Sequence, residues 1–177
     1  IPEYDKIYCV SEPVRKQVIA RFPELADRTE VLLNFIDIKQ VQRRSEEPLS
    51  DPQYTGELKF LTVGRASEEK GYDIAVQITA ELKKRGLCFK WFIIGDGRDL
   101  NKLRTMAKEY QVEQEIIFLG MRENPAPYVK SCDLYLQPSR HEGYPITIVE
   151  ARSLQKVIIA SDIPSMREQI RDCLLYT

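Results

Sequence analysis

Hydrophobic residues fall into short apolar runs that are separated by segments with helical spacing. Ile74, Ile78 and Leu82 recur every four residues, which places them on one face of a helix. The short apolar runs between such segments predict buried strands. Strands are expected at residues 6–10, 30–33, 58–63, 88–94, 115–119, 133–138, 156–160 and 174–176, and helices at 13–21, 73–84, 99–110, 126–130, from 145 onwards, and at 165–170.

The alternation of strand and helix from residue 58 onwards predicts the fold class. Apolar strands joined through helices form a parallel sheet covered on both faces, so we expect a Rossmann-like domain with three layers, α/β/α. Ligands of such sheets bind beyond the carboxyl ends of the strands. We therefore expect the loops that follow the strands to meet at one edge. These loops are Gly64-Arg65, Gly95-Asp96-Gly97, Gly120-Met121-Arg122, Arg140-His141-Glu142 and Ser161-Asp162.

Residues 37–57 lack apolar periodicity. They contain the charged run 43–47 and the turn signal Asp51-Pro52, which are typical of a surface linker. We expect the charged run to stay solvated and do nothing further. The segment would separate residues 1–36 from a main domain at 58–177.

Composition narrows the function classes. Lysine and arginine number 26 against 27 aspartate and glutamate, so no broad basic surface is implied and nucleic acid is not a favoured partner. The sequence contains no apolar run long enough to span a membrane and no signal-peptide pattern. Four scattered cysteines without C-x-x-C spacing, together with one histidine, argue against a metal site. We expect buried free thiols, a reducing compartment and a cytoplasmic protein.

Residues 139–151 are the part of the chain richest in candidate chemistry. Pro145 suits a first helical position, which leaves Glu142 in the preceding loop and Glu150 inside the helix. Free backbone N–H groups at Ile146 and Thr147 would then favour an anion at the helix start. Two carboxylates beside an anion site fit a phosphate that carries hydroxyl-rich groups, as in a nucleotide sugar. The residues alone leave an equally open alternative, namely acids that are solvated at a helix start.

A second candidate lies between Gly64 and Gly71. Arg65 can fork onto a phosphate and Lys70 supplies a point charge. The segment is neither a Walker A loop nor a dinucleotide fingerprint, and a turn with surface charges is the competing interpretation. Gly95-Asp96-Gly97 is interpreted as turn chemistry. His141 is expected to have a structural or hydroxyl-binding role.

Taken in order, these motifs resemble the group 1 (GT4-type) retaining glycosyltransferases. Glu142-Gly143-Tyr144-Pro145 with Glu150-Ala151 resembles the family's E-x7-E signature, and Gly64-Arg65 with Lys70-Gly71 resembles its G-R-x-x-x-x-K-G loop. Three further segments fall in the family's order and spacing: 93–97, 118–120 and 161–168. The resemblance covers about residues 58 to 170.

The resemblance implies the C-terminal, donor-binding half of a GT-B enzyme, with residues 1–36 as the end of the acceptor-side domain and the crossover. Arg65 and Lys70 would neutralise the donor diphosphate, Glu150 would take the ribose hydroxyls and Glu142 would contact the transferred sugar. The implied catalytic residues are Glu142, Arg65 and Lys70. The implied donor-binding residues are Gly64, Arg65, Lys70, Met121, Arg122, Glu142, Gly143, Tyr144, Pro145, Ile146 and Glu150. The family needs no metal and no cofactor.

The function expected from the resemblance is transfer of a sugar from a UDP- or GDP-sugar to a glycan or lipid-linked acceptor, with retention of configuration. The acceptor would bind mainly to an N-terminal domain absent from this chain, and the chain alone would not turn over. Peripheral contact of the full enzyme with the inner face of a membrane is left open. A non-catalytic nucleotide-sugar module of the same fold is the alternative. A dehydrogenase half and a receiver-like domain are disfavoured because their motifs are missing.

Overall fold

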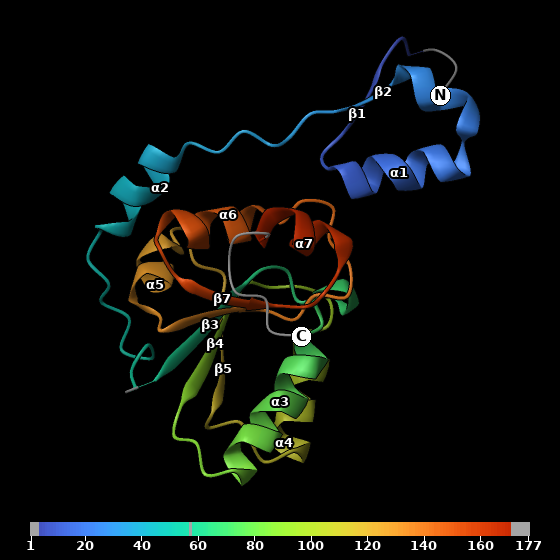
Figure 1. Cartoon of the computed structure of the whole chain (residues 1–177). Helices are drawn as coiled ribbons and strands as arrows, with labels where there is room; N and C mark the ends of the chain where they lie inside the picture. Colours follow the sequence, from blue (N-terminus) through green and yellow to red (C-terminus); the bar gives the residue numbers. More distant parts are fainter. Residues whose placement is uncertain (1–3, 57, 171–177) are drawn as a thin grey trace.

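The computed structural model describes residues 4–56 and 58–170. Its centre is a five-stranded sheet in which every pairing is parallel (Figure 1). The strand order is β5-β4-β3-β6-β7, so the direction of winding reverses between β3 and β6. The strands are β3 (Lys59–Val63), β4 (Lys90–Ile94), β5 (Ile116–Gly120), β6 (Leu134–Gln137) and β7 (Val157–Ala160). The predicted Rossmann-like fold is confirmed.

Helices lie on both faces of the sheet. Figure 1 shows α5, α6 and α7 above it and α3 and α4 below it. The helices are α3 (Tyr72–Lys84), α4 (Leu100–Glu109), α5 (Ala126–Ser131), α6 (Ile146–Ser153) and α7 (Pro164–Ile170), and a single 3-10 turn, η2 (Glu68–Lys70), precedes α3. Two hydrophobic clusters form the core, one on each face, because alternate strand residues point to opposite sides. Phe92 and Tyr135 belong to the upper cluster, and Phe60 and Trp91 to the lower.

The lower face is covered only in part. The buried residues of α3 are Tyr72, Ala75, Val76, Thr79 and Ala80. Ile74, Ile78 and Leu82 lie on one face of α3, as their spacing predicts, and border an apolar groove of about 460 Å³ beside β6 and β7. The connections from β3 to β4 and from β4 to β5 run in one direction across the sheet and place α3 and α4 below it. The connection from β6 to β7 runs in the opposite direction and places α6 above it. Within residues 58–170, no helix therefore lies under β6 and β7.

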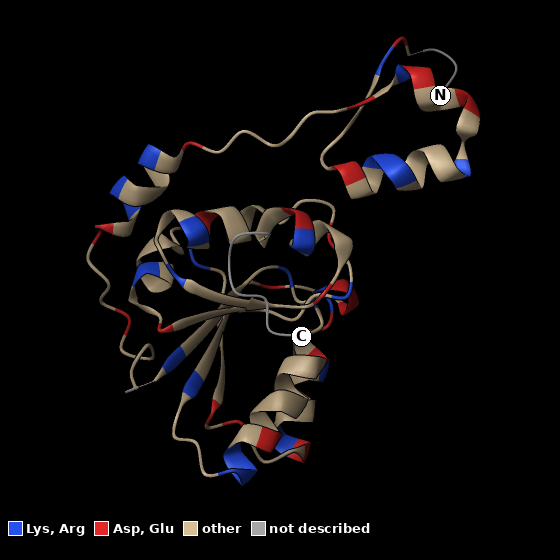
Figure 2. Cartoon of the chain, in the orientation of Figure 1, with Lys and Arg blue, Asp and Glu red and all other residues tan. Residues whose placement is uncertain are grey.

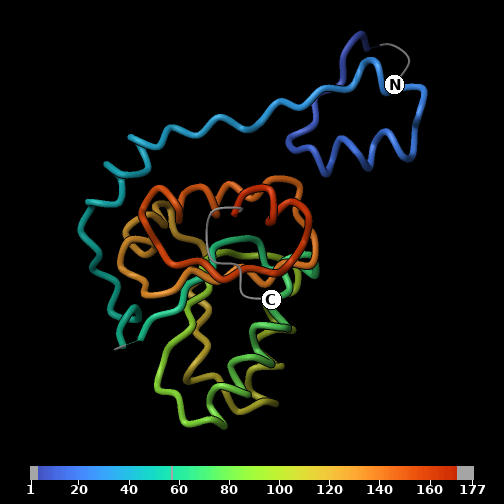
Figure 3. Tube along the Cα trace, in the orientation of Figure 1, coloured from blue at the N-terminus to red at the C-terminus, as the bar shows by residue number. Residues whose placement is uncertain are grey.

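The N-terminal residues form a small unit of their own. It consists of β1 (Ile7–Cys9), α1 (Glu12–Arg21), the 3-10 segment η1 (Pro23–Arg28) and β2 (Thr29–Val31), and β1 pairs with β2 in parallel. Ser11 caps α1 by accepting a hydrogen bond from Val14 N at 3.4 Å. An extended stretch then leads to the main sheet domain (Figure 3).

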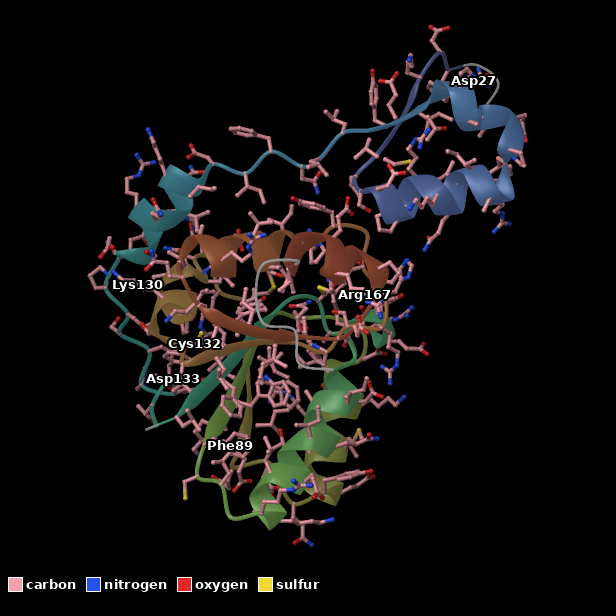
Figure 4. The ribbon with its side chains drawn as sticks, viewed as in Figure 1. Asp27, Phe89, Lys130, Cys132, Asp133 and Arg167 are labelled. Atoms are coloured by element: carbon pink, nitrogen blue, oxygen red, sulfur yellow. The ribbon has the colours of Figure 1, made fainter. Side chains whose placement is uncertain are left out.

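A helix stands where the sequence predicted no regular structure. This helix, α2 (Ile38–Ser45), is capped by Asp37, whose Oδ1 accepts from Gln40 N at 2.9 Å. It packs on α5 and α6. Just after α2, Glu46 forms an ion pair of 2.5 Å with Lys130 of α5 (Figure 4). The charged run is therefore not merely solvated, and the prediction was wrong on this point.

Several smaller expectations can also be checked. Pro145 is the residue that caps α6, not its first helical residue. Cys9 and Cys132 are buried free thiols, whereas Cys88 is exposed, and burial raises the pKa of Cys132 to about 12. The strand expected at 174–176 and the thiol of Cys173 lie outside the described residues. In the described part of the chain, no helix is long and apolar enough to cross a membrane, and no cluster of acidic, cysteine or histidine side chains could hold a metal.

Candidate functional site

The loops that follow the strands meet at the carboxyl edge of the sheet, as predicted. Gly64 N donates to Ile94 O at 2.9 Å, and Gly95 N donates to Gly120 O at 2.9 Å. The contact is close enough that a Cβ on Gly95 would lie 1.9 Å from Gly64 O. Gly95 also has a φ of +140°, which side chains disfavour. The Gly95 loop therefore forms a turn that packs closely on the Gly64 loop, and the turn was expected from its sequence.

Lys70 and Glu142 form the centre of the site, although they lie on different loops. Lys70 Nζ contacts Glu142 Oε1 at 2.6 Å. The same carboxylate oxygen accepts from Ser139 Oγ at 2.7 Å and from Gln137 Nε2 at 3.0 Å. The Glu142 side chain is only 8% exposed. The three hydrogen-bond donors around its Oε1 replace hydrogen bonds to water that the buried carboxylate has lost.

The turn that carries Lys70 is fastened to the loop that carries Glu142. Arg140 binds both carboxylate oxygens of Asp73 at 2.6 Å, and its backbone N donates to Glu69 O at 2.8 Å. These hydrogen bonds from Arg140 keep the pKa of Asp73 below its ordinary value. Gly71, with a φ of +66°, passes so close to β6 that a Cβ there would lie 2.0 Å from Pro138 O. The glycine after Lys70 is therefore required for the turn to reach β6.

A first cavity of about 660 Å³ opens beside this pair. Its lining combines positively and negatively charged residues, and Figure 2 shows segments of both colours in the loops at this edge of the sheet. The lining residues are Arg65, Ser67, Glu69, Lys70, Arg98, His141, Glu142 and Gly143. Arg65 and Lys70 thus border one cavity, as the phosphate-binding hypothesis requires.

The start of α6 lies against the N-terminal unit. Gly143 O accepts from Ser11 Oγ at 2.8 Å, and a Cβ on Gly143 would lie 3.3 Å from a methyl group of Val10. Tyr144 is half-buried, and Ile146 is exposed in the first turn of α6. The N-terminal unit therefore reaches the candidate site through Ser11.

Glu150 borders a different cavity. This second cavity, of about 210 Å³, lies between α2, the β5–α5 loop and α6. Burial raises the pKa of Glu150, and the positive charge of Arg44 partly offsets that rise. Gly143 borders the first cavity and Ile146 the second, so the helix start lies between the two carboxylates. The two glutamates therefore border separate cavities, one on each side of the start of α6.

Arg122 has a structural role in this structure. Its Nη2 contacts Asp51 at 2.8 Å and its Nε contacts Tyr128 Oη at 3.1 Å. Burial tends to raise the pKa of Asp51, but the hydrogen bond from Arg122 brings the net shift below the ordinary value. Because these contacts occupy the guanidinium, we leave the Arg122 side chain out of the site proposed below. Met121 is 70% exposed, and a role for it stays a prediction.

Sequence reasoning did not identify all the residues that shape the site. It missed Gln137, Ser139, Arg98 and Arg44. Gln137 gave a usable signal, because an amide in the middle of a buried strand needs polar partners. It is 1% exposed, and its Oε1 accepts from Tyr135 Oη at 3.2 Å, which turns its Nε2 towards Glu142.

Comparison with known proteins identifies the family of the chain. The family model for group 1 glycosyl transferases matches residues 44–173. An uncharacterised glycosyltransferase of Methanocaldococcus jannaschii is 30% identical over 165 residues, which is 90% of this chain and 40% of that protein. An N-acetylgalactosamine-N,N'-diacetylbacillosaminyl-diphospho-undecaprenol 4-alpha-N-acetylgalactosaminyltransferase of Campylobacter jejuni is 25% identical over 162 residues, which is 91% of this chain and 42% of that protein.

Among solved structures, Anabaena HepE in complex with UDP and glucose superposes with a TM-score of 0.83 at 20% identity, covering 98% of this chain and 49% of HepE. That likeness supports the fold. The chain spans less than half the length of each of these three proteins. The match of the family model over most of the chain establishes the family, and the chain belongs to the group 1 glycosyltransferases.

Proposed function

We propose that this chain is the donor-binding half of a GT4-type glycosyltransferase that transfers a hexose-type sugar with retention of configuration. The observation that carries the proposal is the Lys70–Glu142 pair, which borders the same cavity as Arg65 at the carboxyl edge of the sheet. Parallel sheets bind ligands at this edge. The family membership supports the reaction class.

The proposed roles follow from charge and position. Arg65 and Lys70 bind the donor diphosphate and neutralise the negative charge that grows on the leaving nucleotide. Backbone N–H groups at the start of α6 add partial positive charge. Because side chains and the helix start supply this charge, the proposal assigns no metal and no cofactor to the site.

The contact between Lys70 and Glu142 is compatible with donor binding. A lysine ammonium has three donors, so Lys70 can keep one hydrogen bond to Glu142 and direct the others to a diphosphate. Glu142 Oε1 is held by Lys70, Ser139 and Gln137, which leaves Oε2 to accept sugar hydroxyls. In this proposal, Glu142 orients the sugar and keeps Lys70 in place at the same time.

The proposed donor extends across the helix start. Its diphosphate and sugar occupy the first cavity, and its ribose lies towards Glu150 in the second. Carboxylates accept the paired hydroxyls of a ribose well. The two glutamates of the E-x7-E motif would therefore serve the sugar and the nucleoside separately.

We further propose that the whole protein acts on a glycan or lipid-linked acceptor, at the cytoplasmic face of a membrane. The name of the Campylobacter relative, which contains a diphospho-undecaprenol-linked sugar, supports this acceptor class. Residues 1–36 would be the end of the acceptor-side domain. Their contact with Gly143 through Ser11 supports a place beside the reacting sugar.

Calorimetry with UDP-, GDP- and ADP-sugars, without added metal, tests the proposal. We expect one nucleotide class to bind to the chain, and Arg65→Ala and Glu150→Ala each to weaken that binding at least tenfold. Arg85→Ala is the matched control, because Arg85 is exposed at the far end of α3 and pairs only with Glu81 among the described residues. Binding that survives both site variants would contradict the proposed site. A full-length protein that neither binds nor transfers any sugar would contradict the enzyme assignment.

A further inference from the structure

The second cavity has a wall that the proposed function does not use. One side is formed by Glu150 and Ile146 of α6 and by residues 124–126. The other side is formed by residues 35–37 and by Gln40, Val41 and Arg44 of α2. The helix that the sequence did not predict therefore faces the carboxylate to which we assign the ribose.

Arg44 is the residue of α2 with the most connections to this site. Its Nη2 donates to Glu123 O at 3.0 Å, and its own carbonyl oxygen accepts from Asn124 Nδ2 at 2.9 Å. Two bonds in opposite directions thus fix α2 to the β5–α5 loop. The loop in turn borders the second cavity at Asn124.

Arg44 also acts on Glu150 through its charge. Within the described residues, no hydrogen bond to the Glu150 carboxylate is present, and Arg44 is the charged residue that offsets the effect of burial on its pKa. A half-buried carboxylate without donors is a ready acceptor for hydroxyl groups that a ligand brings. A nearby positive charge stabilises that carboxylate until the ligand arrives.

The neighbouring residue offers a natural comparison. Arg43 lies one position earlier on the same helix, carries the same charge and is exposed. It does not border the second cavity. Substitutions of Arg43 and Arg44 therefore separate the effect of a positive charge anywhere on α2 from the effect of a positive charge that borders the same cavity as Glu150.

We propose that Arg44 is a positioning residue of the donor site, which fixes the β5–α5 loop and supplies the positive charge beside Glu150, so that α2 forms the nucleoside wall of the site. The inference rests on the proposed function. That proposed function already places the ribose of the donor in the second cavity. In this inference the charged run 43–47 is part of the donor site through Arg44, and not only part of a linker.

Binding of UDP and GDP, each compared with its 2′-deoxy form, tests the inference by calorimetry. In the unmodified chain we expect the ribose form to bind about tenfold more tightly, because a hydrogen bond to a charged acceptor is lost in the deoxy form. In Arg44→Ala we expect ribonucleotide affinity to fall about tenfold and the preference for ribose to fall towards one. Arg44→Lys should keep part of the ribonucleotide affinity and part of the preference for ribose. Arg43→Ala should change neither the affinity nor the preference.

Glu150→Gln completes the test, because it keeps the shape of the side chain and removes the charge. In that background, Arg44→Ala should no longer change the preference for ribose. Arg44→Ala overturns the inference if it leaves the preference intact, or if it weakens the ribose and deoxyribose forms by the same factor, as a purely structural residue would. Failure of the unmodified chain to bind either nucleotide would instead contradict the proposed function, and the inference with it.

Discussion

Two polar regions of this chain look alike in sequence and differ in what could be inferred from them. The segment 64–71 and the run 43–47 are both rich in basic residues and glutamate. In the first, the preceding strand and the glycines at positions 64 and 71 fix the turn, so that Arg65 and Lys70 border the first cavity. In the second, the charges face α5, α6 and the β5–α5 loop only because α2 docks there. The meaning of a charged run thus depends on the surface that it meets.

The largest expected effect tests whether the segment after α2 belongs to the core. Tyr54 is 7% exposed, and its ring lies 4.5 Å from that of Phe92 and 5.0 Å from that of Tyr128. Tyr54→Ala should lower the free energy of unfolding by about 3 kcal/mol, because a buried aromatic ring is lost and a cavity remains. Urea denaturation measures the change.

Tyr110→Ala is the control for that experiment, since Tyr110 is 45% exposed. It should change the free energy of unfolding by less than about 0.5 kcal/mol. If the Tyr54 variant behaved like the Tyr110 variant, residues 46–56 would be a linker, as the sequence suggested. The docking of this part of the chain on the main domain would then contribute little to stability.

The next effect concerns the motif-bearing region. Lys70→Ala leaves Glu142, 8% exposed, without its counter-charge, whereas Ser139 and Gln137 remain. Because Lys70 itself is 23% exposed, we expect a loss of about 2 kcal/mol in stability, less than for a fully buried pair. Donor binding should fall by about a hundredfold or more.

A second substitution separates folding from binding at this pair. Adding Glu142→Gln to Lys70→Ala removes the uncompensated charge, so most of the stability should return while donor binding stays lost. Denaturation and calorimetry on the same preparations measure both quantities. Recovery of donor binding in the double variant would show that Lys70 serves only to neutralise Glu142.

The smallest effect depends on pH and again concerns the linker. Contacts with Arg122 hold the folded-state pKa of Asp51 below its ordinary value. A lowered folded pKa contributes stability above the unfolded value of about 4, and this contribution is lost as the pH falls through the folded value. Asp51→Asn should therefore cost about 1 kcal/mol at pH 7 and progressively less below pH 4. A cost that stays constant between pH 7 and pH 3 would rule out this ion pair as its source.

The sequence contained enough local information to predict the sheet. Apolar runs identify each described strand to within about two residues, and Ser11 was recognisable as a cap because it stands directly before Glu12-Pro13. The convergence of the loops followed from parallel connectivity alone. Arg65, Lys70 and Glu142 were identifiable because their order and spacing resemble those of a family.

Other features depend on contacts that no local pattern encodes. The helix α2 has few apolar residues of its own and is stabilised by docking on α5 and α6. The ion pair of Arg122 is an example, because its partner Asp51 lies far away in sequence and no local pattern indicates the contact. The spacing placed Ile78 on one face of a helix, but it did not show that this face borders a groove under β6 and β7, where the lower face of the sheet carries no helix within residues 58–170.

A crystal structure of the chain with the nucleoside diphosphate that binds it tests the central claim most directly. The account predicts the diphosphate within hydrogen-bond distance of Arg65 and Lys70, beside the start of α6, with the ribose hydroxyls turned towards Glu150. A nucleotide bound away from the carboxyl edge of the sheet, or a diphosphate that contacts neither Arg65 nor Lys70, would contradict it.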